Sequence, residues 1–76
     1  MKAEAARRKM ETMIAARSTE SLVEIVRTLN LKFGQGEMIV SDMVTKELER
    51  RMPEAAFVTL MGELEAEIDA FSRTAA

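Results

Sequence analysis

The stretch from residue 57 to residue 71 carries the pattern that most constrains how this chain can fold. Apolar side chains recur there at spacings of 4, 3, 4 and 3, so in an α-helix they all lie within about a third of the circumference. They are Phe57, Met61, Leu64, Ile68 and Phe71, and Leu60 joins the same face. Coiled coils have this spacing, and in them such a stripe packs against another helix. The pattern predicts a long helix at about residues 53–71, with its stripe at or beside an interface between two copies of the chain.

The rest of the sequence also favours helices. Ala, Glu, Leu, Met, Arg and Lys are abundant, all of them are good helix formers, and only residues 38–40 have any strand character. Three further helices are expected: at about residues 3–16, from an N-cap at Ser18 or Thr19 to about residues 30–32, and from about residue 39 or 41 to residue 51. The helix that begins near residue 39 or 41 ends at residue 51, because Met52, the residue before Pro53, is disfavoured in the α region.

Residues 33–37 form the clearest loop. Gly34 and Gly36 flank one polar residue, so a positive φ is available at either position. The pair does not indicate a nucleotide site, because it lacks a third glycine, a Gly-Lys-Ser or Gly-Lys-Thr ending and a preceding strand. A turn between two helices accounts for it.

The expected fold is all-α: a small helical bundle of three core helices with a basic N-terminal helical arm. Residues 1–17 form the arm, residues 18–71 the core domain, and residues 72–76 a frayed tail. The arm's apolar stripe is weak, because two of its four members, Ala3 and Ala6, are only alanines. The chain carries about two dozen large apolar side chains, more than one small bundle hides well, so we expect dimerisation to complete the bundle.

The residue types exclude most catalytic machinery. The 76 residues include no Cys and no His, so there is no disulfide, no zinc knuckle and no His-based catalytic triad. A chain this short also lacks the volume to enclose an ordinary substrate pocket. We therefore expect no enzyme activity, no catalytic residue, no cofactor and no metal. The acidic side of the last helix is interpreted as a solvated face; it consists of Glu63, Glu65, Glu67 and Asp69.

Cytoplasmic residence without a membrane partner is the expected localisation. No apolar run approaches the roughly 20 residues that span a bilayer. The first residues are charged and lack the apolar core of a signal peptide. The absence of Cys is consistent with a reducing compartment.

Charge is unevenly distributed along the chain. The formal net charge of -2 combines +3 in residues 1–17 with -5 in residues 18–76. Two basic clusters are candidates for contact with nucleic acid or another partner: Arg7, Arg8 and Lys9 in the arm, and Lys46, Arg50 and Arg51 in the third helix. Against DNA binding stand the net acidic charge, a loop longer than the turn of a helix-turn-helix, and Ser41 and Asp42 where base-reading residues are expected. The alternative is that the second cluster pairs with Asp42, Glu47 and Glu49.

Glu47 and Arg51 stand close to the centre of an otherwise apolar face of the third helix. They are one turn apart, so they can form an ion pair. One interpretation is that both long side chains reach past the apolar stripe to water. The other is that the face contacts a second subunit and that the pair fixes the register of that contact.

The leading functional hypothesis is a non-enzymatic, self-associating helical interaction module that binds another macromolecule. Such a module would act as a small accessory or regulatory protein. A protein partner is favoured over nucleic acid because the chain is net acidic. The first alternative is a small dimeric DNA-binding regulator that uses the basic arm and the third helix. The second is an inhibitor that presents the acidic helix to a basic partner.

Overall fold

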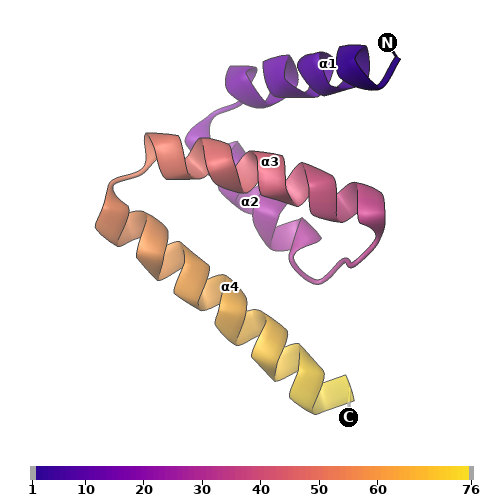
Figure 1. Ribbon diagram of the computed structural model, residues 1–76. Helices are drawn as coiled ribbons and strands as arrows, with labels where there is room; N and C mark the ends of the chain where they lie inside the picture. Colours follow the sequence, from indigo (N-terminus) through magenta and orange to yellow (C-terminus); the bar gives the residue numbers. More distant parts are fainter. Residues whose placement is uncertain (1, 76) are drawn as a thin grey trace.

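The computed structural model describes residues 2–75, which form four α-helices and no strand (Figure 1). The helices are α1 (Lys2–Ala16), α2 (Thr19–Leu29), α3 (Gln35–Arg51) and α4 (Glu54–Ala75). The prediction of an all-α fold is confirmed. Within residues 2–75, none of the helices combines the length and the apolar character needed to cross a bilayer.

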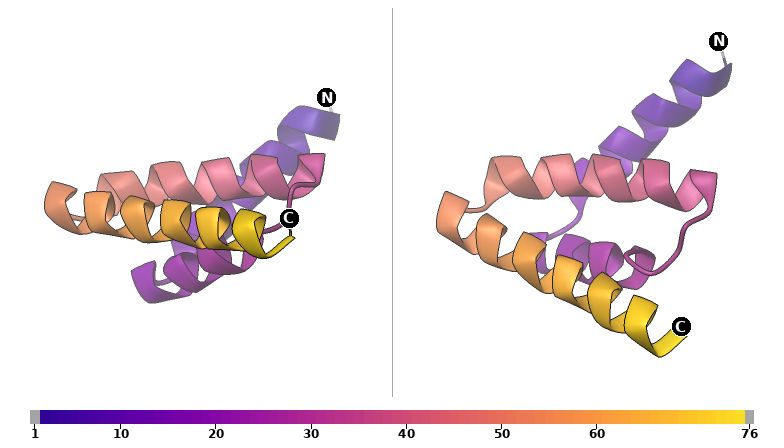
Figure 2. Two further views of the ribbon diagram at one scale, coloured as in Figure 1. Left: turned by 90° about the horizontal axis from the view of Figure 1, so that it is seen from below. Right: turned by 60° about the horizontal axis from the view of Figure 1, so that its bottom comes forward.

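The helices form a thin, open arrangement around α3. α1 and α4 lie on opposite sides of α3, and α2 packs beside it (Figures 1 and 2). The principal extents are 41 × 29 × 15 Å, and the shortest is little more than the ~10–12 Å diameter of one helix. The radius of gyration is 13.5 Å, whereas about 11 Å is usual for a domain of this length. The molecule therefore exposes much of every helix.

The core is small and draws on all four helices. α2, α3 and α4 each contribute two side chains that are four residues apart. Residues with this spacing lie one turn apart on the same side of a helix, so both can face the core. The buried residues are Ile14, Leu22, Val26, Val44, Leu48, Leu60 and Leu64. α1 supplies only Ile14, so the arm is attached to the core by one buried side chain.

The start of α2 agrees with the sequence analysis. Ser18 is the N-cap, with φ -68° and ψ 157°, and its hydroxyl accepts a hydrogen bond of 3.1 Å from the backbone N–H of Ser21. α2 ends at Leu29, and the Asn30 side-chain amide donates to the backbone carbonyl of Leu64 at 2.9 Å. This bond ties the end of α2 to α4.

α3 begins at Gln35, four residues before the earlier of its two predicted starts. Gly34 is its N-cap and Gly36 lies inside its first turn; within the described residues no glycine has a positive φ. The prediction of a loop over residues 33–37 was therefore wrong at its C-terminal end. Glycine is an acceptable N-cap, and one glycine in a helix costs only about 1 kcal/mol, so neither stops the helix.

The junction between α3 and α4 is as expected, but α4 extends further. Met52 leaves the α region with ψ 147°, and the Pro53 carbonyl accepts the first bond of α4 from the Phe57 N–H at 3.0 Å. α4 then continues to Ala75, past the predicted end at residue 71. An ion pair of 2.8 Å between Asp69 and Arg73 spans the extra turn and supports it.

We predict that Leu64→Glu unfolds the protein, because Leu64 is only 6% exposed and an unpaired carboxylate in the core costs several kcal/mol. Val58→Glu is the matched control on the same helix, since Val58 is 60% exposed and its substitution costs within about 0.5 kcal/mol. Urea unfolding followed by circular dichroism measures both variants. Equal stability of the two variants would contradict this core.

Candidate interaction surface

An apolar groove lies between α1 and the N-terminal half of α3, with a volume of about 810 Å³. We call it the α1–α3 groove. It is lined by Ala3, Ala6, Arg7, Met10, Phe33, Gln35, Met38, Ile39, Val40, Asp42 and Met43. Among the residues with described side chains, Arg7 and Asp42 supply its charged groups, and the rest of the lining is mainly methyl, thioether and aromatic surface.

The groove exists because α1 presents small side chains to α3. Ala3 and Ala6 are too short to fill the space beside α3, while Met10 and Ile14, further along α1, reach the core or pack against it. The early start of α3 adds a further turn of helix to the opposite wall. The N-terminal half of α1 therefore stands over α3 with an unfilled gap between them.

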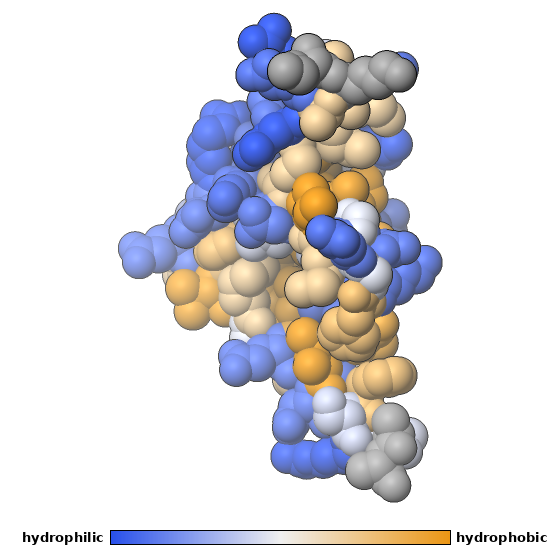
Figure 3. Space-filling view, turned by 45° about the vertical axis from the view of Figure 1, so that its right-hand side comes forward, coloured by the Kyte–Doolittle hydropathy of each residue, from blue (hydrophilic) through white to orange (hydrophobic). Residues whose placement is uncertain are grey.

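Three large apolar side chains of the α1–α3 groove are mostly exposed. Phe33 is 58%, Met38 56% and Ile39 55% exposed. Single exposed apolar residues are ordinary on protein surfaces, but three that line one groove form a contiguous patch, which is typical of an interaction site. Figure 3 shows that hydrophobic side chains continue in a strip along this face, from the α1 end to the C-terminal end of α4, between hydrophilic margins.

A second, smaller groove lies where the ends of α2 and α4 meet. Leu31 and Phe71, 39% and 46% exposed, line it together with Arg27, Glu67, Ala70 and Thr74. It has a volume of about 440 Å³. Apolar surface is therefore exposed at both ends of the molecule.

The apolar stripe of α4, expected at or beside an interface, is largely covered within one chain. Leu60 and Leu64 belong to the buried core, and Phe57 and Met61 pack against it partly buried. Ile68 is half-buried, and Phe71 is exposed. The surface of the stripe that is free to meet a second molecule thus lies toward its C-terminal end.

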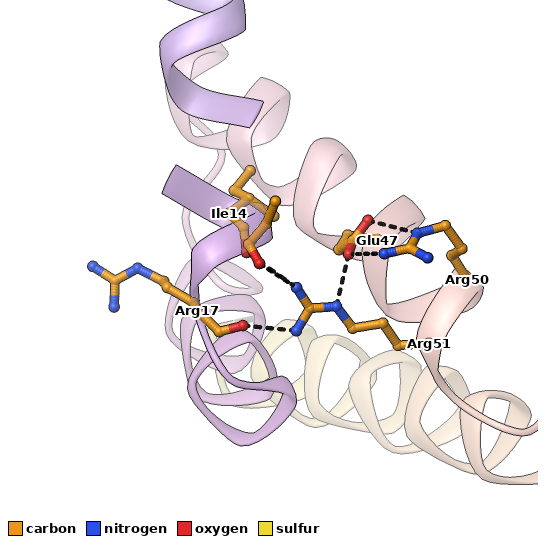
Figure 4. Close-up of polar contacts among 6 residues, drawn as sticks. Ile14, Arg17, Glu47, Arg50 and Arg51 are labelled. Atoms are coloured by element: carbon orange, nitrogen blue, oxygen red, sulfur yellow. Dashed lines mark hydrogen bonds and ion pairs between the residues drawn. The ribbon is translucent and has the colours of Figure 1, made fainter. Parts of the chain in front are cut away.

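Arg51 joins the end of α1 to the end of α3 (Figure 4). Its guanidinium donates to the backbone carbonyls of Arg17 at 2.7 Å, Ala15 at 3.0 Å and Ile14 at 3.4 Å. The last turn of α1 has no basic residue of its own, so Arg51 supplies the cation that the carbonyls at this negative end of the helix attract. The side chain is only 17% exposed.

Glu47 holds the guanidinium of Arg51 from within α3. Its carboxylate accepts hydrogen bonds from Arg50 at 2.6 and 3.1 Å and from Arg51 at 2.7 Å (Figure 4). These bonds, first from Arg50 and then from Arg51, outweigh desolvation and lower the pKa of Glu47 to about 2. Glu47 and Arg51, the pair proposed to fix register, thus form an ion pair within one chain.

The other predicted cationic contacts lie on the outside of the molecule. On α3, Lys46 pairs with Asp42 at 3.3 Å, and the Glu47 carboxylate offsets the charge of Arg50 and raises its pKa. On α1, Arg7 pairs with Glu11 at 3.3 Å, while Arg8 and Lys9 are exposed. The structure therefore places the two basic clusters on different helices, and every cation of the α3 cluster has a partner.

Sequence reasoning missed Arg27, which connects α2 to α4. Its guanidinium donates hydrogen bonds to the carboxylates of Glu63 at 2.6 Å and Glu67 at 3.3 Å, and the bond to Glu63 raises the pKa of Arg27 most. The one signal in the sequence was that Glu63 and Glu67 lie one helical turn apart, and this spacing does not identify the cation that they bind. Two of the four acidic residues that were assigned to a solvated face, Glu63 and Glu67, therefore form ion pairs with α2 of the same chain.

Comparison with protein-family models, curated proteins and solved structures finds no match to this chain. Within the described part of the chain, no group of three or more His, Cys, Asp or Glu residues is placed to hold a metal ion. Function is therefore inferred from the surface and the charges of this chain alone.

We predict that acid destabilises the protein through Glu47. Its pKa is lowered from 4.5 to about 2, so its carboxylate contributes stability that is complete above about pH 5 and is lost as the pH falls toward 2. Glu47→Gln should be less stable at pH 7 and should lose less stability between pH 5 and pH 2. Thermal unfolding at several pH values measures this, with the exposed Glu49→Gln as control. Identical pH profiles for wild type and Glu47→Gln would refute the assignment.

We further predict that Arg51→Met releases α1. The change keeps an apolar stem but removes the hydrogen bonds to the carbonyls of α1, worth roughly 2 kcal/mol for a charged donor. Amides of α1 should then exchange hydrogen about 30-fold faster, while α2 and α3 keep their protection. Arg50→Met is the control, because Arg50 is 71% exposed and bonds only to Glu47. Unchanged exchange in α1 would show that Arg51 does not hold the helix.

Proposed function

We propose that the protein is a non-enzymatic, self-associating helical interaction module that binds another macromolecule. One observation carries this proposal: a single chain exposes too much surface. Its accessible area is 5742 Å², whereas a folded monomer of 8.5 kDa exposes about 4,700 Å². The excess of about 1,000 Å² is close to the ~800 Å² that each partner buries in a protein–protein interface of standard size.

The nature of the excess surface supports association. Among the described residues, seven large apolar side chains are more than a third exposed, and three of them, Phe33, Met38 and Ile39, line one groove. With a small core and no disulfide, the chain gains stability from any partner that covers this surface. In this proposal, two chains complete the bundle that one chain leaves open.

A protein partner is favoured over nucleic acid. The α1–α3 groove is mainly apolar, and apolar surface recognises proteins, whereas duplex DNA is bound through free cations. The cations of α3 are already matched by carboxylates or carbonyls of the same chain. The alternative of an inhibitor with an acidic helix is weaker because charges within the chain are again already paired. Glu63 and Glu67 form ion pairs with Arg27 of the same chain.

We predict that Ile39→Glu abolishes self-association without unfolding the chain. Ile39 lines the α1–α3 groove and is 55% exposed, so a carboxylate there is tolerated by the free chain and disfavoured in a covered interface. Sedimentation velocity at ~100 μM should show a dimer for wild type, provided that its Kd lies near or below ~10 μM, and a monomer for the variant.

Val58→Glu serves as the control, since Val58 is about as exposed as Ile39 but does not line the groove. Circular dichroism checks that both variants keep their helices. A wild-type chain that sediments as a monodisperse monomer at ~100 μM, above the Kd of a specific dimer, would overturn the proposed self-association.

A further inference from the structure

The two outer helices carry opposite charge. α1 contains four basic and two acidic side chains, a net of +2, and α4 contains one basic and five acidic side chains, a net of -4. They lie on opposite sides of α3 (Figures 1 and 2). Arg27 of α2 pairs with Glu63 and Glu67 of α4 and so reduces the net charge on the α4 side to -3. The molecule therefore still has a basic edge and an acidic edge.

The hydrophobic strip connects these two edges. It begins at the α1 end of the face and reaches the C-terminal end of α4 (Figure 3). Apolar surface is exposed near both ends, in the α1–α3 groove and around Phe71. Any second molecule that lies along the strip therefore meets mostly apolar surface, crossed near its middle by hydrophilic atoms, with cations at one end and carboxylates at the other (Figure 3).

A second copy of this chain fits the strip in only one direction. If two strips packed in parallel, α1 would face α1 and α4 would face α4, so like charges would meet at both edges. If they pack antiparallel about a twofold axis, each α1 faces the α4 of the other copy. Both pairs of opposite edges then match, and the apolar ends cover each other.

We propose that two copies form an antiparallel, twofold-symmetric dimer in which α1 of each copy packs against the C-terminal half of α4 of the other. This inference rests on the proposed self-association and specifies its geometry. On α1, Arg7 lies at the groove and Lys9 is exposed. On α4, Glu65 is exposed, and among the described residues it makes no ion pair within the chain, so its charge is free for a partner.

Cross-linking tests the direction of packing. The chain has no Cys, so Ala6→Cys on α1 and Ser72→Cys on α4 introduce the only thiols, both at exposed positions. The two variants are mixed, one of them isotopically labelled, and treated with a short bis-maleimide. The antiparallel dimer predicts cross-links mainly between residues 6 and 72 of different chains. Adding Ile39→Glu to both variants controls for random collision and should abolish them.

Each cross-linking result has a distinct meaning. Cross-links mainly between identical positions would overturn the antiparallel arrangement and leave self-association intact. A monomer in sedimentation, with no cross-link above the collision control, would overturn both proposals. The extent of 41 Å keeps the two edges far enough apart for the two kinds of cross-link to be distinguished.

Charge reversal gives an independent test. Arg7→Glu with Lys9→Glu changes the net charge of α1 from +2 to -2, and Glu65→Lys with Asp69→Lys changes that of the C-terminal half of α4 from -2 to +2. Each double variant alone makes both α1–α4 contacts repulsive and should dimerise at least ~10-fold more weakly at low salt. An equal mixture of the two should recover a heterodimer, because each contact then joins opposite charges again.

A matched double variant on α2, Glu20→Lys with Glu24→Lys, changes the net charge by the same amount at exposed positions away from both edges. It should dimerise like the wild type, and wild-type dimerisation should weaken as salt rises. Dimerisation that is insensitive to both edge variants, or a mixture that does not recover a heterodimer, would contradict the antiparallel contact.

Discussion

The placement of α1, and with it the α1–α3 groove, depends on the guanidinium of Arg51. α1 contributes only Ile14 to the buried core, so apolar packing alone holds it weakly. The carbonyls at its C-terminal end carry partial negative charge, and no cation in its own last turn offsets them. Arg51 meets these carbonyls from α3, and Glu47 orients Arg51. Together with Ile14, this guanidinium holds the C-terminal end of the arm against α3.

Charged and apolar side chains have different roles in this molecule. The best-connected cations, Arg27 and Arg51, are used to join helices of the same chain, and neither is free to recruit a partner. The apolar residues Phe33, Met38 and Ile39 are in contrast presented outward. In the proposed dimer, recognition is a matter of covering apolar area, and the opposite charges of α1 and α4 would set the orientation of the two copies.

Local patterns predicted the helices, because helix formation depends on spacing and capping within a few residues, as at Ser18 and Pro53. They predicted the Glu47–Arg51 pair within α3, but not the partners of Arg27 on α4 or the carbonyl partners of Arg51 at the end of α1. Those partners lie 34–40 residues away along the chain, and spacing within one helix carries no information about contacts between helices. The α1–α3 groove was missed because Gly34 and Gly36 indicated a loop, although both are compatible with the start of α3. A prediction that placed residues 33–37 in a loop and started the helix at residue 39 or 41 left one wall of the groove incomplete.

The 15 Å thickness of the molecule has a consequence for how its sequence can vary. A body about one helix thick keeps few side chains from water, and seven apolar residues are buried in the part of the chain that the structure describes. Substitution is costly at buried positions and usually mild elsewhere. Chains with this fold can therefore differ at most of their positions, provided that they keep a few apolar residues one turn apart and a long cation at the end of α3. The architecture is tolerant of mutation, and the shape of its surface can be redesigned with little risk to its helices.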